Sequence, residues 1–411
     1  MIVGIDLGTT NSLVGVYQDG QIKLIPNAFG EYLTPSVVAL DDNDEIIVGK
    51  IAKERLVTHP DKTVSQFKRF MGTKHELTLG NRAYKAEELS SFIIRKLVDD
   101  AETYLGEKVE EVIVSVPAYF NDAQRYATKL AGKFAGVQID RIINEPSAAA
   151  LAKRSMVNQE DQSFIVVDFG GGTLDISVVE LFDNIVEIVS IAGDNRLGGE
   201  DFTAAIAEEF LVSNQLTKDT ISLEFYSKIL VQAEKTKLEL NDKEEVKMTV
   251  LDQEQEYTLD LSYQRFYELC QPLLARVKAV LDRALMDARY SYVSSDNFVL
   301  GGGTSKLRLV QDFLSYCINQ MVQVSDDPDR MIARGCALLA GIKERQGEIR
   351  DLLLSDICPF TLGIEIVGDR FSPIIERNST LPASRIEQYY TAELGQSQVK
   401  IKVYQGEMMK A

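Results

Sequence analysis

Cysteine and histidine are scarce in this sequence, with four cysteines and two histidines among 411 residues. No two cysteines form a C-x-x-C pair, so we expect neither a disulfide framework nor a zinc site. Two of the cysteines, Cys317 and Cys336, fall within apolar helical patterns, where burial in a core is the usual role of the residue.

Basic residues are also few, with 44 lysines and arginines against 62 aspartates and glutamates and a net charge of −18. Nucleic-acid binding needs clustered lysine and arginine, so we expect no nucleic-acid partner and attribute the acidity to solubility. No apolar run is long enough to cross a bilayer, so no membrane association is expected. The chain enters an expected strand at Ile2 without a basic leader, which predicts no signal peptide and a cytoplasmic protein.

Glycine, by contrast, is concentrated in two bends of the same kind. The apolar run 163–167 stops at Asp168-Phe-Gly-Gly-Gly-Thr173, and a β-branched run follows, which is typical of two buried strands joined by a tight hairpin. The chain begins in the same way, with the run 2–5 and the bend Asp6-Leu-Gly-Thr-Thr-Asn11. Glycines leave backbone N–H groups open to an anion. The two hairpins therefore indicate an internal duplication that holds a polyphosphate from both sides.

The glycine motifs of the common nucleotide-binding loops are absent. Neither G-x-x-x-x-G-K-[ST] nor G-x-G-x-x-G occurs, so a nucleotide site would use the two facing hairpins. Acids lie beside the glycine bends or at strand ends, at Asp6, Glu145, Asp168 and Asp175. Clustered acids near phosphates repel each other unless a cation lies between them, so we expect Mg²⁺ there. Each acid taken alone is an ordinary turn or cap residue.

Phosphoryl transfer to water needs mainly an in-line water and neutralisation of charge. Lys68 is assigned to the γ-phosphate and the attacking water, and Glu145 and Asp168 to orienting the water and the hydrated magnesium. From pattern alone, Lys68 is better explained as a solvated helix residue, so its assignment depends on convergence in space. The residues assigned to the phosphates are Thr9, Thr10, Gly171 and Gly172.

The length allows two or three domains, and strands alternate with helices as in an α/β layered sheet. Helices are expected at 62–71, 89–105, 122–134, 224–240, 265–288 and 329–343. Strands are expected at 21–25, 36–40, 112–116, 186–191 and 297–300, with a small sheet at 246–250 and 256–261.

The last part of the chain predicts a different unit. After a charged stretch, the leucines at 352–354 predict either a hydrophobic linker that docks or a short core strand. Short strands are then expected at 361–367, 372–375, 387–392 and 398–403, which indicates a separate all-β unit. These strands are too few for a closed sandwich, so we expect an incomplete unit.

Five motifs follow one another along the chain in an order that is typical of one protein family. They are Gly4-Ile-Asp-Leu-Gly-Thr-Thr-Asn-Ser12, Val116-Pro-Ala-Tyr-Phe-Asn-Asp122, Asn144-Glu-Pro146, Asp168-Phe-Gly-Gly-Gly-Thr173 and Leu197-Gly-Gly-Glu-Asp-Phe202. Together they closely resemble the DnaK-type heat-shock protein 70 chaperone family, over the whole chain from residue 2. Phe29-Gly-Glu-Tyr-Leu-Thr-Pro35 and Asp356-Ile-Cys-Pro-Phe360 look most like the HscC branch of that family.

The resemblance implies an α/β fold in three parts. Residues 1–350 would form a duplicated actin-like ATPase of two lobes with ribonuclease H-like cores and nucleotide in the cleft. Residues 351–356 would form a hydrophobic interdomain linker. Residues 357–411 would begin a peptide-binding β-sandwich, without its helical lid. The implied cofactors are ATP or ADP and Mg²⁺, with K⁺ as a further ion.

The resemblance also implies roles for individual residues. The catalytic residues are Lys68, Glu145, Asp168 and Thr173, and magnesium is held largely through water by Asp6, Asp168 and Asp175. The nucleotide-binding residues are Gly8, Thr9, Thr10, Asn11, Gly170, Gly171, Gly172, Gly198, Gly199, Glu200, Glu234, Lys237, Asn241, Gly302, Gly303, Lys306 and Asp329. The relay between cleft and linker comprises Pro117, Arg125, Leu352, Leu353 and Leu354, and the peptide pocket comprises Val367, Ala392 and Val399.

Four positions depart from the family pattern. Leu238 and Asn241 replace the arginine or isoleucine and the serine that are common on the adenine side. Lys306 replaces an arginine, whose guanidinium plane stacks on a base as an ammonium cannot. Ser355 interrupts the leucine run of the linker, so weaker docking is expected.

The implied function is an ATP-dependent molecular chaperone in which ATP binding and hydrolysis control affinity for unfolded hydrophobic peptide. It would act as a monomer with a J-domain co-chaperone and a nucleotide exchange factor. Two other classes stay open, a sugar or acetate kinase on the same duplicated core and a filament-forming actin-like protein. A kinase would need a second substrate pocket and would lack the β-rich extension.

Overall fold

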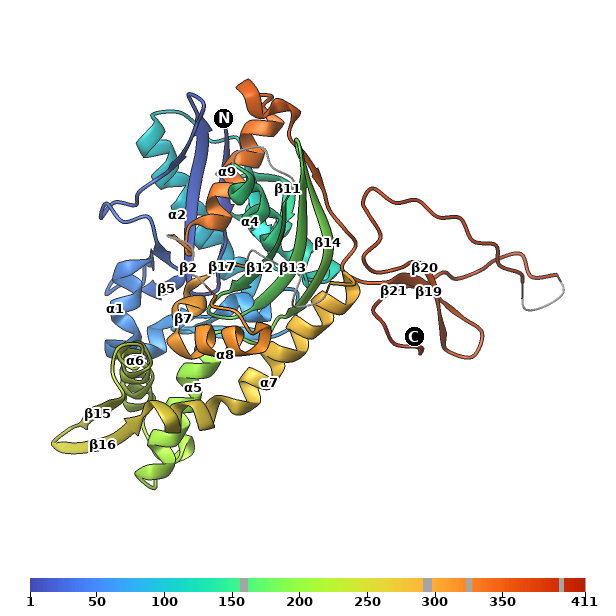
Figure 1. Ribbon diagram of the computed structural model, residues 1–411. Coiled ribbons are helices and arrows are strands. Elements are labelled where there is room, and N and C mark those ends of the chain that lie inside the picture. Colours follow the sequence, from blue (N-terminus) through green and yellow to red (C-terminus); the bar gives the residue numbers. More distant parts are fainter. Residues whose placement is uncertain (156–161, 291–297, 323–326, 392–394, 411) are drawn as a thin grey trace.

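The computed structural model describes residues 1–155, 162–290, 298–322, 327–391 and 395–410 (Figure 1). Two large sheets form its body. The first has the order β3 (Gln21–Leu24), β2 (Asn11–Gln18), β1 (Ile2–Asp6), β10 (Glu111–Val116) and β11 (Gln138–Asn144), and β4 (Thr34–Pro35) pairs with β2. The second has the order β18 (Leu353–Ser355), β14 (Ile185–Asp194), β13 (Leu174–Phe182), β12 (Gln162–Phe169) and β17 (Phe298–Gly301).

The two sheets repeat one topology. In the first sheet β1, β2 and β3 are antiparallel neighbours, and in the second β12, β13 and β14 are antiparallel neighbours. On the other side of the first strand of each set, β1 pairs with β10 and β12 pairs with β17 in parallel. Each glycine bend joins the first two strands of its sheet. The internal duplication expected from the bends is therefore present in the strand order.

Helices pack on both faces of each sheet. The helix α2 (Ala86–Leu105), with α3 (Asp122–Phe134) beside it, covers one face of the first sheet, and α7 (Tyr263–Asp287), with α5 (Gly199–Ser213) beside it, covers the second. Between the sheets lie α4 (Glu145–Arg154) and α9 (Met331–Lys343) (Figure 1). Successive side chains of β10 point to opposite faces of the first sheet. Val112 and Val114 belong to the core with α2, whereas Ile113 belongs to the core with α4 and α9.

The central helices are in backbone contact. A Cβ placed on Gly335 of α9 would lie 1.8 Å from the carbonyl oxygen of Ala148 in α4. A Cβ placed on Gly4 of β1 would lie 2.3 Å from the backbone of Cys336. Glycine at both positions therefore lets α9 pack tightly against α4 and the first sheet.

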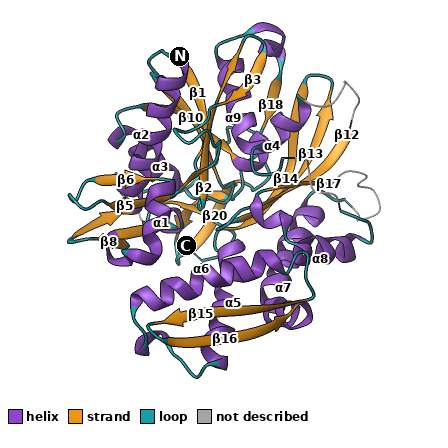
Figure 2. Cartoon of the chain, turned by 90° about the vertical axis from the view of Figure 1, so that its left-hand side faces the viewer, coloured by secondary structure: helices purple, strands orange, loops and turns teal. Residues whose placement is uncertain are grey.

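Smaller units surround the cleft between the sheets. The first sheet carries the small sheet β6 (Ile46–Val48), β5 (Val37–Leu40) and β7 (Thr63–Ser65), the helix α1 (Lys50–Thr58) and the hairpin β8 (Glu76–Leu79) and β9 (Arg82–Lys85). The second carries α6 (Leu223–Glu239), α8 (Arg308–Ile318) and the hairpin β15 (Glu245–Asp252) and β16 (Gln255–Ser262). Figure 2 shows this hairpin beside α6 and α5.

The helix expected at 62–71 is wrong. Residues Thr63–Ser65 form β7 and pair with β5, and only Phe67–Phe70 form a short 3₁₀ helix. Gln66 separates the two with a left-handed backbone, φ 57°. β-Branched residues at 63 and 64 favour the strand, and the pairing with β5 is a tertiary contact that periodicity does not report.

The C-terminal unit is a three-stranded sheet with the order β20 (Arg370–Ile375), β19 (Leu362–Ile366) and β21 (Val403–Gln405). It lies to one side of the body, beyond β14 (Figure 1). The strands expected at 387–392 and 398–403 are wrong for 387–391 and 398–402, and residue 392 lies outside the described residues. Neither segment is paired as a strand in the described part of the chain, although the Lys402 carbonyl accepts a hydrogen bond from the Glu365 N–H of β19 at 3.2 Å. No helix within the described ranges is long and apolar enough to span a membrane.

Candidate functional site

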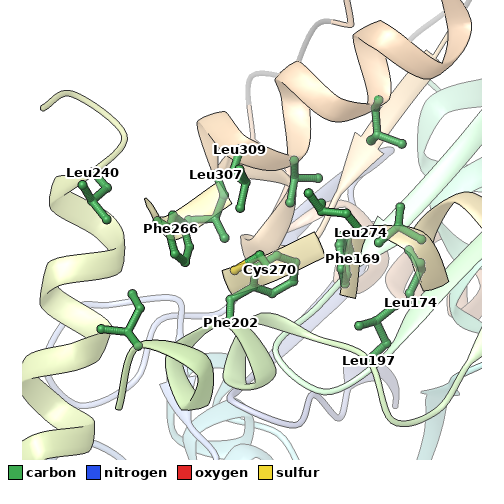
Figure 3. Close-up of a cluster of buried hydrophobic side chains, with 14 of the residues drawn as sticks. Phe169, Leu174, Leu197, Phe202, Leu240, Phe266, Cys270, Leu274, Leu307 and Leu309 are labelled. Carbon is green, nitrogen blue, oxygen red and sulfur yellow. The ribbon is translucent and has the colours of Figure 1, made fainter. Parts of the chain in front are cut away.

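The second glycine bend is anchored by the core beneath it. Phe169 and Leu174, which flank the bend, are fully buried and point into a cluster with Phe202 and Leu197 (Figure 3). The rings of Phe169 and Phe202 lie 5.9 Å apart in an edge-to-face arrangement. The bend is thus held at both ends by apolar packing, which keeps its backbone amides in place.

The two bends touch each other. A Cβ placed on Gly171 would lie 1.9 Å from Oγ1 of Thr10, and one placed on Gly172 would lie 2.7 Å from Cγ2 of Thr9. Gly198 also packs against the second bend, because a Cβ placed on Gly198 would lie 2.3 Å from the backbone of Gly171. Only glycine permits such close approach of the chains. The two sheets therefore share one cleft at these bends.

That cleft is a pocket of about 350 Å³, within the range of ligand-binding pockets. Most predicted site residues line it. They are Asp6, Gly8, Thr9, Thr10, Asn11, Lys68, Glu145, Asp168, Gly170, Gly171, Thr173, Gly199, Glu200, Glu234, Lys237, Gly302, Gly303, Lys306 and Asp329. Residues from both sheets, far apart in sequence, therefore converge on one space.

Four predicted residues lie outside the lining of this pocket. Gly172 and Gly198 pack against the neighbouring bends instead. Asp175 is buried behind the bend with 1% of its surface exposed. Asn241 accepts a hydrogen bond from the backbone N–H of Arg308 at 2.9 Å, so it caps the start of α8. That Asn241 contacts the nucleotide stays a prediction.

Lys68 and Glu145 form a buried ion pair at the centre of the cleft. The distance between Lys68 Nζ and Glu145 Oε1 is 2.7 Å, and the side chains are 4% and 5% exposed. The Lys68 ammonium also lies 5.6 Å from the centre of the Phe120 ring. The left-handed residue Gln66 turns the chain just before Lys68, which places the lysine inside rather than on a solvated helix face.

Three aspartates share the buried space around this ion pair. Burial, and then the charge of Glu145, raise the pKa of Asp6 to about 7, although Ser115 donates a hydrogen bond to it at 3.0 Å. The same two causes raise the pKa of Asp168 and Asp175 well above the ordinary value. Neither carboxylate oxygen of Asp175 has a hydrogen bond of normal geometry among the described residues. Such a cluster is stabilised in its charged form by a cation.

These carboxylates suit magnesium bound through water. In the described part of the chain, no three histidine, cysteine or acidic side chains converge closely enough to coordinate an ion directly. Mg²⁺ commonly keeps several waters and uses one or two carboxylates together with substrate phosphates. Asp6 and Asp168 line the cleft and would hold such a hydrated ion, with Asp175 buried behind them.

The other end of the cleft is formed by α5, α6 and the third glycine turn. Lys237 donates hydrogen bonds to the Gly199 carbonyl and the Thr203 hydroxyl, both at 2.9 Å. Lys306 and Asp329, which both line the pocket, form an ion pair with each other. Leu238, half exposed, lines this end and adds an apolar surface.

Sequence reasoning missed Thr304. It lines the pocket and donates a hydrogen bond to the Gly170 carbonyl at 2.8 Å, which ties the third glycine turn to the second bend. The sequence does contain a signal, because in Gly301-Gly-Gly-Thr304 a threonine follows the glycines, as it does in the other two bends. The remaining lining residues that were missed are Leu13, Leu33, Leu307, Pro328 and Ile332.

Comparison with known proteins identifies the family. A model of the Hsp70 protein family matches residues 2–79 and 75–411. The chain belongs to the Hsp70 family. The chaperone protein DnaK of Thermotoga neapolitana is 40% identical over 424 aligned residues, which cover 99% of this chain and 70% of that protein. The DnaK proteins of Thermotoga petrophila and Thermotoga maritima are 39% identical with the same coverage. None of these names tests the HscC branch, which stays a prediction.

In this Hsp70 chain the leucine segment does form a docked strand. Leu353–Ser355 pairs in parallel with β14 as the edge strand β18. Leu352 and Leu354 pack against the core between the sheets, whereas Leu353 is 61% exposed. The short strand that the sequence offered as one alternative is therefore present, and the interdomain linker stays a prediction. Ser355 does not prevent this pairing, because the backbone makes it.

The residue after that strand connects it to the cleft. Asp356 accepts hydrogen bonds from Asn144 Nδ2 at 3.0 Å and Ser147 Oγ at 2.9 Å. Arg125 donates to Asn144 Oδ1 at 2.7 Å and to the carbonyls of two residues that follow Pro117. Of the predicted relay residues, Arg125 is thus joined through Asn144 to Asp356, in a hydrogen-bond network that ends beside Glu145. The relay itself stays a prediction.

The C-terminal unit also contacts the body of the Hsp70 chain. Arg377 forms an ion pair with Asp287 of α7 at 2.6 Å, and the rings of Phe360 and Tyr119 lie 4.9 Å apart. The residues predicted to line a peptide pocket are not enclosed here. Val367 and Val399 are 72% and 70% exposed, and Ala392 lies outside the described residues.

Proposed function

We propose that this chain is an ATP-dependent molecular chaperone in which the nucleotide state controls affinity for unfolded hydrophobic peptide. The observation that carries the proposal is the meeting of two glycine bends around a cleft with a buried lysine and several acids, in a chain 40% identical to a DnaK chaperone. No finding favours the sugar or acetate kinase.

Within this proposal, residues 1–350 are a two-lobed actin-like ATPase, 351–356 the interdomain linker, and 357–411 the start of a β-sandwich. The repeated strand order of the two sheets supports two duplicated lobes, because each sheet has its own glycine bend and its own outer helices. The pairing of β18 with β14 supports a linker that docks on the second lobe.

The proposed reaction is hydrolysis of ATP to ADP and phosphate. Thr9 and Thr10 and the amides of the second bend would bind the phosphates, and the Lys68 ammonium would neutralise the γ-phosphate and hold the attacking water. Bound magnesium would supply positive charge for the phosphates. Glu145, paired with Lys68 at 2.7 Å, would orient the ammonium and the water. The burial of these groups strengthens their electrostatic effect on the transferring phosphoryl group.

The helix α4 is the proposed connection between the cleft and the linker. Glu145 is the first residue of α4, and its neighbours Asn144 and Ser147 hold Asp356. A change in the Lys68–Glu145 pair when the γ-phosphate is lost would shift the first turn of α4, and with it the two hydrogen bonds to Asp356. Linker docking would then depend on the nucleotide, which is the basis of allosteric control.

Further parts of the proposal rest on the family alone. They are a J-domain co-chaperone, a nucleotide exchange factor, K⁺ as an additional ion, a monomeric state and a cytoplasmic location. The proposed peptide-binding role of Val367 and Val399 also stays a prediction, since both side chains are exposed.

The test is a direct comparison of peptide affinity in two nucleotide states. Fluorescence anisotropy of a labelled, extended hydrophobic peptide would be measured with the protein in ADP and in ATP, with ATP turnover recorded in parallel. We expect slow ATP turnover and at least tenfold weaker peptide binding in ATP, equivalent to about 1.4 kcal/mol of coupling. Equal affinity in both states, despite turnover, would refute the proposed control.

A further inference from the structure

A second cavity, of about 250 Å³, adjoins the nucleotide cleft. Thr9, Lys68 and Thr173 line both spaces, so these three side chains form the wall between them. The cavity continues from that wall to Asn121 and Arg196, which are exposed on the surface. It has room for several water molecules or a hydrated anion.

The charged side chains that line this cavity are cationic, whereas most of those that line the cleft are acidic. Its lining includes Lys68, Arg69 and Arg196, and none of the described residues that line it is acidic. The cleft, by contrast, is lined by acids on every side, at Asp6, Glu145, Asp168, Glu200, Glu234 and Asp329. Lys68 and Arg69 also pair with Glu145 and Asp201, which are not in the lining, so the exposed Arg196 adds the further positive charge that favours an anion in the cavity.

Arg69 and the first turn of α3 both line the cavity. The Nε atom of Arg69 is buried and has no hydrogen-bond partner in the described part of the chain, although the two Nη atoms of Arg69 contact Asp201. Asn121 and Gln124, at the start of the 13-residue helix α3, line the opposite side. Their side chains and backbone N–H groups bond reciprocally, which fixes this end of α3 and its positive dipole at the cavity.

We propose that this cavity is the exit site for inorganic phosphate, which leaves through it while ADP still occupies the cleft. The proposal rests on the proposed hydrolysis of ATP, because the cleaved phosphate would then lie at Thr9, Lys68 and Thr173, the shared wall. Like-charge repulsion from the acids of the cleft and from ADP drives the phosphate toward the arginines. No bond is made or broken in this step; Arg69 and Arg196 bind the anion and pass it to solvent.

Two substitutions reduce the positive charge of the cavity without touching the proposed catalytic residues. Arg196→Gln removes an exposed cation, and Gln124→Glu adds a carboxylate of nearly the same shape. Gln124→Glu should fold, because glutamate at this position also completes a capping box and suits a helix N-terminus. The matched controls are Arg141→Gln and Gln255→Glu, which make the same changes at exposed strand residues outside both pockets.

The experiment is a single turnover of the full chain with ATP. Acid quenching reports ATP cleavage, a fluorescent phosphate-binding protein reports free phosphate, and a fluorescent ADP analogue reports ADP release. We expect the wild type to release phosphate before ADP. In both variants we expect the rate of ATP cleavage to be unchanged and the rate of phosphate release to be about tenfold lower. This is the effect expected when one charge is changed a few ångströms from a dianion in a solvated cavity. High salt should remove most of the difference.

The same site is tested from the opposite direction with added inorganic phosphate. Phosphate that enters the cavity of the ADP complex should slow ADP dissociation, and both variants should need about tenfold more phosphate for the same effect. Equal phosphate dependence in variants and controls, or simultaneous release of phosphate and ADP by the wild type, would overturn the proposal. Absence of ATP cleavage in the wild type would instead refute the proposed function, so the two failures are distinguishable.

Discussion

Replacement of Lys68 by methionine tests the centre of the cleft. Methionine has a similar volume and removes only the charge, so packing around the site is retained. The substitution leaves Glu145 buried without its cation, beside Asp6 and Asp168. Breaking a buried ion pair by removing one partner typically costs about 3–5 kcal/mol of stability.

The expected loss of activity is separate from the loss of stability. Removing one preorganised charge from a transition-state site costs about 10²–10³-fold in rate. We therefore expect ATP turnover to fall by at least about 100-fold in Lys68→Met, while nucleotide affinity changes much less. Single-turnover cleavage and calorimetry with ADP would measure the two quantities.

A second substitution separates the two effects. In Lys68→Met/Glu145→Gln the unpaired buried charge is gone, so denaturant unfolding should show most of the stability recovered. Hydrolysis should stay low, because the ammonium is still missing. Wild-type turnover in Lys68→Met, or recovery of turnover in the double variant, would show that Lys68 serves only the fold.

Three further predictions concern the linker and the acids. Asp356→Ala removes the acceptor of two hydrogen bonds, and we expect it to lower peptide stimulation of ATP turnover at least threefold, measured as the ratio of rates with and without peptide. Leu354→Asp should undock β18 and abolish that stimulation, because Leu354 packs against the core. The control Leu353→Asp, on the same strand, should have a much smaller effect, because the Leu353 side chain is 61% exposed. Equal effects of the two substitutions would contradict the docking geometry. The native pKa of Asp6, about 7, lies above its unfolded value of 3.8, so the nucleotide-free protein binds more protons when folded than when unfolded. Its free energy of unfolding should therefore fall as the pH rises from 4 to 7, by at most about 4 kcal/mol. Denaturant unfolding should show a shallower pH dependence in Asp6→Asn, and an unchanged one would count against this assignment.

Local patterns predicted the elements that local chemistry determines. The apolar runs on either side of each glycine bend define strands, and the acids beside them are buried where the bends meet. The pair of bends also predicted an internal duplication, and the repeated strand order of the two sheets agrees with it.

The errors arise where a distant contact decides the outcome. The segment around Lys68 has the composition of a helix but pairs with β5 and turns at Gln66, so the lysine enters the cleft. The segment 387–391 has strand-forming residues but lies in a long loop without a partner strand.

The first turn of α4 imposes a relation between the two ends of the proposed mechanism. Glu145 bonds Lys68 in the cleft, while Asn144 and Ser147, on either side of it, bond Asp356 after the docked strand. Both sets of bonds depend on the position of one helix terminus, so neither can change without affecting the other. By reciprocity of coupled binding, any effect of ATP on linker docking must equal the effect of docking on ATP affinity. Asp356→Ala should therefore reduce two quantities by the same factor: the difference in peptide affinity between the ATP and ADP states, and the effect of bound peptide on the affinity for ATP relative to ADP. Coupling that stays at the wild-type value in this variant would mean that the bonds to Asp356 are not the path between the cleft and the linker.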